Sequence, residues 1–195
     1  ELSLAYFMQK YWQKQPLLIK QGFKNFQDPL SADELAGLAL EDEVESRLVE
    51  CRDGNWQLET GPFEDFNRYG DKDWTILVQA VDHWHPPAAE LIEPFRFIPN
   101  WRIDDLMVSF STPGGGVGPH FDNYDVFLLQ AHGKRRWRIG RQKDFTLQEG
   151  VPLKILTNFE PEEEWVLEPG DMLYLPPKWA HDGIAEGECM TYSVG

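Results

Sequence analysis

The chain has 195 residues, and hydrophobic residues make up 42% of it, which is enough to fill one folded core and excludes a largely disordered protein. It carries 18 basic and 33 acidic residues, a formal net charge of −15 that argues against direct nucleic-acid binding by this domain and favours a basic protein partner. No apolar run is long enough for a transmembrane helix, and two cysteines, Cys51 and Cys189, are too few for a disulfide scaffold and fit a reducing cytoplasm.

The first hundred residues predict a mixture of short helices and strands. Ser3 is placed to cap a helix over residues 4–12, and Ser31 with Glu34 forms a capping box that opens a helix through residue 40. Apolar residues recur at helical spacing between Trp74 and Trp84, so a helix is expected there, and another over residues 88–95. Short strands are expected over residues 17–20, 46–51 and 56–60.

From about residue 101 the pattern changes to short strand-like runs separated by glycine and proline. These runs cover residues 106–111, 126–130, 136–139, 165–167, 172–175 and 190–194. Strands dominating one half of a chain predict a mainly β fold, a barrel or sandwich with flanking helices packed outside it.

Two histidines and one aspartate carry the strongest chemical signal. His120 and Asp122 lie two residues apart at the start of an expected strand, so their side chains share a face. His181 follows a turn, a strand and a second turn further along the chain. Two imidazoles and one carboxylate on one side of a metal ion are the ligand set of non-haem Fe(II) oxygenases, which keep coordination positions open for a co-substrate and O₂. Zinc accepts the same ligands, so the residues alone leave the metal open.

The His-x-Asp…His pattern, together with the Pro169-Gly170-Asp171 turn and the run from Leu175 to His181, resembles the Jumonji-C (JmjC) branch of the 2-oxoglutarate oxygenases in the cupin superfamily. Four further segments, residues 12–16, 33–39, 78–81 and 101–106, resemble the bacterial ribosomal oxygenases within that branch. The resemblance implies a double-stranded β-helix, or jelly-roll, barrel. It implies a JmjC-type catalytic domain over residues 1–195, with an N-terminal elaboration over 1–100 and a barrel core over 101–195. The dimerisation and winged-helix domains that usually follow in this family are then absent from this chain, and the full-length protein is expected to be a homodimer.

The resemblance also implies roles for individual residues. His120, Asp122 and His181 would bind Fe(II), and the Arg135 guanidinium with the Ser111 hydroxyl would hold the distal carboxylate of 2-oxoglutarate. Strand alternation places Asp105 and Met107 on the same face as Ser111. Asp105 would then accept the guanidinium of a substrate arginine. The channel residues implied beside it are Met107, Tyr124 and Ser193.

The implied reaction is hydroxylation at C3 of an arginine in the large-subunit ribosomal protein L-sixteen, a basic protein, in the cytoplasm and away from membranes. O₂ is consumed and 2-oxoglutarate becomes succinate and CO₂. Three alternatives stay open from the sequence. They are a Jumonji-type methyl-lysine demethylase, which releases formaldehyde, a metal-binding cupin barrel without turnover, and a zinc-dependent cupin isomerase or hydrolase.

Overall fold

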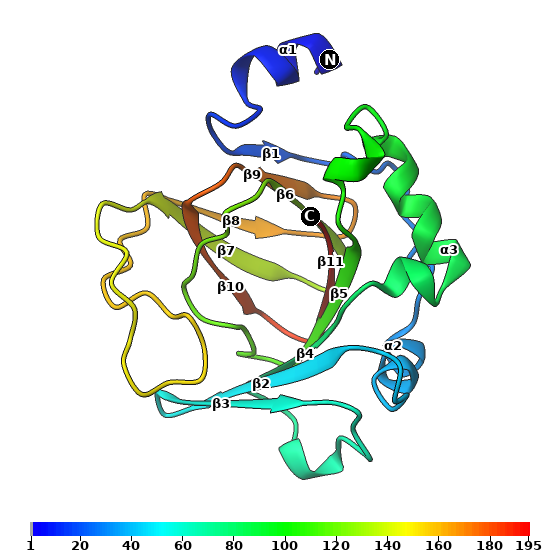
Figure 1. Ribbon diagram of the computed structural model, residues 1–195, viewed down its shortest axis with the longest axis vertical. Coiled ribbons are helices and arrows are strands. Elements are labelled where there is room, and N and C mark those ends of the chain that lie inside the picture. The colour runs from blue at the N-terminus through cyan, green and yellow to red at the C-terminus, as the bar shows by residue number, and fades with distance from the viewer. Residues whose placement is uncertain (1) are drawn as a thin grey trace.

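The computed structural model describes residues 2–195 and consists of two antiparallel β-sheets with short helices on one side (Figure 1). The larger sheet has eight strands in the order β1-β9-β6-β11-β5-β4-β2-β3, and the smaller sheet has three in the order β10-β7-β8. The strands of the larger sheet are β1 (Leu17–Ile19), β2 (Ser46–Arg52), β3 (Asn55–Thr60), β4 (Trp74–Val78), β5 (Leu106–Ser111), β6 (Val126–His132), β9 (Met172–Leu175) and β11 (Cys189–Val194). Those of the smaller sheet are β7 (Arg135–Arg141), β8 (Glu163–Leu167) and β10 (Trp179–Ala185).

The two faces of the larger sheet bury different cores. Its outer face packs against the helices, with Leu106 and Val108 of β5 among the buried residues. Its inner face meets the smaller sheet, where Leu128 and Leu173 pack with Trp137 and Ile139. Two antiparallel sheets packed face to face are the jelly-roll arrangement, so the expected mainly β fold is confirmed. The space between the sheets is where inward side chains of both can meet.

Helical segments are short and cover the outer face of the larger sheet (Figure 1). They are α1 (Leu4–Lys10), α2 (Ala32–Leu38), α3 (Pro86–Ala89) and the 3₁₀ helices η1 (Asn67–Tyr69), η2 (Val81–His83), η3 (Glu90–Phe95) and η4 (Asn100–Arg102). Ser3 caps α1, and the capping box of Ser31 and Glu34 at the start of α2 is confirmed. Among residues 2–195, no helix combines the length and the apolar character that crossing a bilayer requires.

The helix expected over residues 74–84 is wrong. Residues 74–78 form β4 instead, and only η2 follows it. All five residues of β4 are buried, because the strand has neighbours on both edges and is covered on both faces. A strand covered on both faces has a continuous apolar sequence, and such a run does not distinguish a strand from a buried helix.

Strands β1 to β4 from the first hundred residues belong to the same sheet as the later ones. Residue 47 pairs with 77, residue 77 with 109 and residue 109 with 191, so the N-terminal part continues the barrel wall. The division at residue 100 into an elaboration and a barrel core stays a prediction.

Candidate functional site

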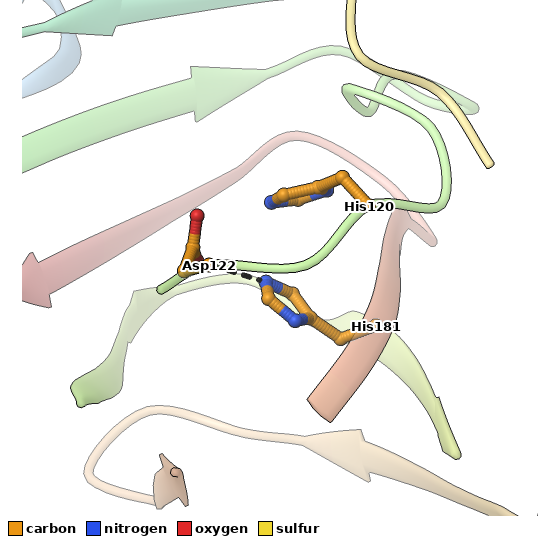
Figure 2. A group of neighbouring side chains, drawn as sticks. All are labelled: His120, Asp122 and His181. Carbon is orange, nitrogen blue, oxygen red and sulfur yellow. Dashed lines mark ion pairs between the residues drawn. The ribbon is translucent and has the colours of Figure 1, made fainter. Parts of the chain in front are cut away.

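The structure brings the two histidines and the aspartate together at one end of the space between the sheets (Figure 2). One ligand atom from each of His120, Asp122 and His181 lies within 4.8 Å of the others. The His181 Nε2 atom is 3.5 Å from Asp122 Oδ2, and the two imidazole ring centres are 4.2 Å apart. This is a compact set of two nitrogen ligands and one oxygen ligand.

Main-chain hydrogen bonds join the two segments that carry these side chains. The amide of His120 donates to the carbonyl of His181 at 3.0 Å, and the amide of His181 donates back at 2.8 Å. Beside this pair, the amide of Lys178 donates to the carbonyl of Asp122 at 2.7 Å. The backbone therefore holds the two ligand-bearing segments side by side.

Each imidazole is oriented by a carbonyl oxygen. His120 Nδ1 is 2.9 Å from the Gly118 carbonyl and His181 Nδ1 is 2.9 Å from that of Trp179. A carbonyl only accepts, so each Nδ1 carries a proton, and Nε2 is the ring nitrogen left to bind a metal ion. Burial of His181, with the nearby His120 as a smaller contribution, lowers its pKa to about 3. A neutral imidazole with a free lone pair is the form that binds a metal ion.

Deeper between the sheets, Arg135 is a buried cation. It begins β7, is 4% exposed, and donates from Nη2 to the Ser111 hydroxyl at 2.5 Å. The Thr75 hydroxyl is 2.8 Å from that of Ser111. Within residues 2–195, no carboxylate pairs with this guanidinium, and its Nε has no hydrogen-bond partner. A buried charge is costly unless it is paired, so this pocket fits an external carboxylate.

Trp137 lies between the metal-ligand end and Arg135, and the sequence reasoning missed it. Its ring centre is 5.8 Å from that of His181, and the Arg135 guanidinium carbon is 5.8 Å from the Trp137 ring. The indole Nε1 is buried and has no partner among the described residues. Gly183, opposite Trp137 in the register, makes room for the ring, since a Cβ there would lie 2.6 Å from it. The available signal was its position two residues after Arg135 on one strand, which places both side chains on one face.

The pairing of β7 with β10 separates the two ends of the site. His181 is opposite Ile139, while Arg135 is opposite Ala185, four residues along β7. At the rise of an extended strand this places the backbone of Arg135 about 13 Å from that of Ile139. Arg135 Nε and Trp137 Nε1, on the same face of β7, are buried donors that have no partner within the described part of the chain. An elongated acid that carries one carboxylate for Arg135 and metal-binding oxygens at its other end has the chemistry for this space.

The expected substrate residues gather at the metal-ligand end. Met107 of β5 pairs with Ser193 of β11, and this pair lies four residues along β5 from Ser111, which pairs with Cys189. Tyr124 is 56% exposed, and its partial burial together with the charge of Asp122 raises its pKa to about 12. It therefore stands beside the metal ligands as a neutral hydroxyl at the surface.

Asp105 lies at this end too, one residue before β5. Its Oδ2 accepts hydrogen bonds from Gln79 Nε2 at 2.8 Å and from the Ala80 amide at 2.7 Å. The carboxylate is therefore partnered by its own chain, and it does not need a substrate cation to satisfy it. The two donors hold it in place, and its role as a guanidinium acceptor stays a prediction.

Comparison with known proteins agrees with this geometry. A family profile described as "JmjC domain" matches residues 90–195. The E. coli protein named "Ribosomal protein uL16 3-hydroxylase" is 54% identical over 192 residues, which is 97% of this chain and 51% of that protein. The Haemophilus influenzae "Probable ribosomal oxygenase" is 39% identical over 97% of this chain and 48% of its own length.

A solved structure of the E. coli ribosomal oxygenase YcfD, in complex with cobalt and 2-oxoglutarate, superposes with a TM-score of 0.91 at 53% identity. The superposition covers 100% of this chain and 51% of that one. The chain thus spans about half the length of the curated relatives it matches. With the family profile matched over more than half of its residues, the chain belongs to the JmjC domain family.

Proposed function

We propose that this chain is the catalytic domain of an Fe(II)- and 2-oxoglutarate-dependent protein hydroxylase, which adds a hydroxyl group at C3 of an arginine in the ribosomal protein L-sixteen, or uL16. One observation carries the proposal. Arg135 is buried, pairs with no carboxylate among residues 2–195, and lies on the same inner surface as the triad of His120, Asp122 and His181. A metal-binding scaffold without turnover has no need of a second, cationic pocket at that depth. The E. coli relative is named for the uL16 reaction, and the acidic surface of this chain suits a basic substrate.

The residues present fit both the metal and the co-substrate. His120, Asp122 and His181 would hold Fe(II) from one side, and Arg135 with Ser111 would hold the distal carboxylate of 2-oxoglutarate. The iron and 2-oxoglutarate, when bound, supply the activation of O₂, with one oxygen atom going to the substrate and the other to succinate as CO₂ is released.

The chain's own side chains would then select the substrate carbon. Asp105, held by Gln79 and the Ala80 amide, presents a fixed carboxylate for a guanidinium. Tyr124, Met107 and Ser193 border the same end of the site and would limit how the arginine side chain lies. With the guanidinium anchored at one point, a C–H bond near the substrate backbone can be directed toward the metal.

Mass spectrometry tests the proposal directly. The protein is incubated with Fe(II), ascorbate, 2-oxoglutarate and a peptide spanning the arginine of L-sixteen, and the product is fragmented. We expect one added oxygen on C3 of that arginine together with succinate, and neither product from Asp122→Ala. Formaldehyde from a methyl-lysine peptide would identify a demethylase instead. Succinate without peptide oxidation would support 2-oxoglutarate as the co-substrate and contradict L-sixteen as the substrate. Bound zinc in place of iron, with neither product, would favour a cupin isomerase or hydrolase.

The full-length protein would act in the cytoplasm, where its ribosomal substrate is found, and as a homodimer. The dimer rests on the family resemblance alone. Light scattering on the full-length protein tests it, and a mass equal to one subunit at micromolar concentration would contradict it.

A further inference from the structure

A cavity lies outside the site, where α2 leads into β2. It has a volume of about 570 Å³, and its walls combine apolar and acidic side chains. We call it the Trp84 pocket. The residues that define it are Leu38, Leu40 and Trp84, with Glu41, Asp42 and Glu43.

The apolar part of the Trp84 pocket faces solvent. Trp84 is 42% exposed and Leu40 is 43% exposed. Single exposed apolar residues are ordinary, but two that line one cavity beside three acids have the composition of a binding surface. Within residues 2–195, none of these three acids takes part in an ion pair, so their charges are available to a partner.

The pocket is on the same rim of the sheet as the proposed substrate residues. Ser46 at the start of β2 pairs with Val78 at the end of β4, which in turn pairs with Val108 near the start of β5. The Gln79 amide donates to the Glu45 carbonyl at 2.9 Å, and the Gln79 side chain donates to Asp105. One short connection therefore joins the acidic loop to the residue proposed to receive the substrate arginine.

Hydrogen bonds also connect the turn before Trp84 to the start of β5, next to Asp105. The Trp84 amide donates to the Val81 carbonyl, and Asp82 in that turn accepts a hydrogen bond from the Leu106 amide at 3.0 Å. Residues 79–84 thus hold both the neighbour of Asp105 and the aromatic wall of the pocket.

We propose that the Trp84 pocket is a docking site for the basic protein substrate. It would receive an apolar side chain against Trp84 and Leu40, while lysine or arginine residues on either side meet the three acids. Charge selects this occupant. A second copy of the chain would bring a net charge of −15 against a net charge of −15, whereas a basic ribosomal protein is attracted. The inference rests on the proposed function, because that function supplies the basic substrate.

Two variants test the docking site, and both change exposed residues. Trp84→Ala removes the aromatic wall, and a charge variant combines Glu41→Gln, Asp42→Asn and Glu43→Gln. The matched control combines Asp53→Asn, Asp71→Asn and Glu188→Gln, three exposed acids at the opposite end of the strands. It changes the net charge by the same amount. Circular dichroism checks that all of the variants are folded.

The measurement is the dissociation constant of purified L-sixteen protein, and of a short peptide around its arginine, by calorimetry on metal-free protein. We expect each pocket variant to weaken binding of the whole protein roughly tenfold, and to affect the short peptide much less. The effect of the charge variant should shrink in about 0.5 M salt, where exposed charges are screened, and that of Trp84→Ala should persist. The control variant should bind like the wild type.

Unchanged whole-protein affinity in both pocket variants would overturn the docking site. So would a wild-type dimer, seen by light scattering, that Trp84→Ala dissociates, since a second copy would then be the occupant. If the wild type binds L-sixteen through the pocket but adds no oxygen to it, the docking site is supported and the proposed function is contradicted. The two failures are therefore distinguishable.

Discussion

His120 and His181 pair their main chains directly, with nitrogen–oxygen distances of 3.0 and 2.8 Å. The segments that carry the two imidazoles are thus joined by hydrogen bonds of the fold itself. A site of this kind is preorganised, so little ordering energy is lost on binding.

Replacing Asp122 with alanine should remove the metal without unfolding the protein. The substitution deletes the only carboxylate of the triad but leaves the backbone hydrogen bonds around it. We expect Fe(II) affinity to fall by more than about 100-fold and hydroxylation to be lost, since loss of even an outer partner of a metal ligand costs 10- to 100-fold. Calorimetric titration with Fe(II) and the absorption of the Co(II) form measure this. Hydroxylation at the wild-type rate in the variant would show that Asp122 is not a ligand of the catalytic metal.

Arg135→Met should raise the requirement for 2-oxoglutarate. The guanidinium is the buried cation next to Ser111, and losing its hydrogen bonds to a carboxylate costs about 3 kcal/mol, or roughly 100-fold in KM. Lys134→Met is the matched control, because Lys134 is the preceding residue but is exposed and pairs with Glu168 at the surface. Steady-state kinetics over a range of 2-oxoglutarate concentrations give both values. Equal KM values for the two variants would show that another cation holds the carboxylate.

Trp137→Phe should have a smaller effect on the same step. An aromatic ring is retained, but the indole N–H is removed, which is a buried donor without a partner among residues 2–195. If that donor binds the co-substrate, the KM for 2-oxoglutarate should rise about tenfold, as for one lost hydrogen bond. Trp101→Phe, at a position that is 83% exposed, is the control. An unaltered KM in Trp137→Phe would mean that the indole only fills space.

Tyr174→Phe should loosen the loop that carries the metal ligands. The Tyr174 hydroxyl donates to Asp125 at 2.5 Å and accepts from the Gln13 amide at 2.8 Å, so it ties the N-terminal segment to the loop after Asp122. Its loss removes two partly buried hydrogen bonds, one of them to a carboxylate, and we expect the free energy of unfolding to fall by about 2 kcal/mol. Metal affinity should fall with it. Tyr6→Phe, on the exposed helix α1, should change neither quantity in urea denaturation and metal titration.

The contribution of Asp171 to stability should depend on pH. Burial alone would raise the pKa of this fully buried carboxyl, but hydrogen bonds from Lys20 and from the amides of Glu168 and Gln21 outweigh it, and the pKa lies below the usual 3.8. A depressed pKa adds stability at pH values above 3.8 and loses it as the pH falls through the folded value. Asp171→Asn should therefore destabilise the protein at pH 7 and differ less from the wild type near pH 3. A difference that grows with acidity would contradict this sign.

The sequence was most informative where a function depends on residues close together in the chain. The pairing of His120 with Asp122 and the capping box of α2 both depend on local spacing. The strand expected to begin at His120 is wrong, since only an isolated bridge to His181 forms there and β6 begins at Val126. The family resemblance added Arg135 and Ser111, and the structure places their side chains in contact. Their assigned roles remain predictions until the variants above are measured.

Contacts between distant strands could not be predicted from the sequence. Thr75 reaches Ser111 only because β4 is the neighbour of β5. The sequence predicts a helix over residues 74–84, so this strand and its contact were not expected. Gln79 was missed for the same reason, since its contact with Asp105 requires the end of β4 to meet the start of β5. Sheet order is a global property, and periodicity in one segment does not contain it.

Because Gly183 has no side chain, Trp137 can lie where it borders both the metal-ligand end of the site and the end at Arg135. The neighbour of Gly183 across the strands, Trp137, touches the His181 side of the site and the Arg135 side at once. A single methyl group at position 183 would act as a wedge, pushing the indole away from the backbone and into the space shared by metal and co-substrate. A larger residue at position 183 therefore requires a smaller residue at position 137. We expect these two positions to vary together across relatives.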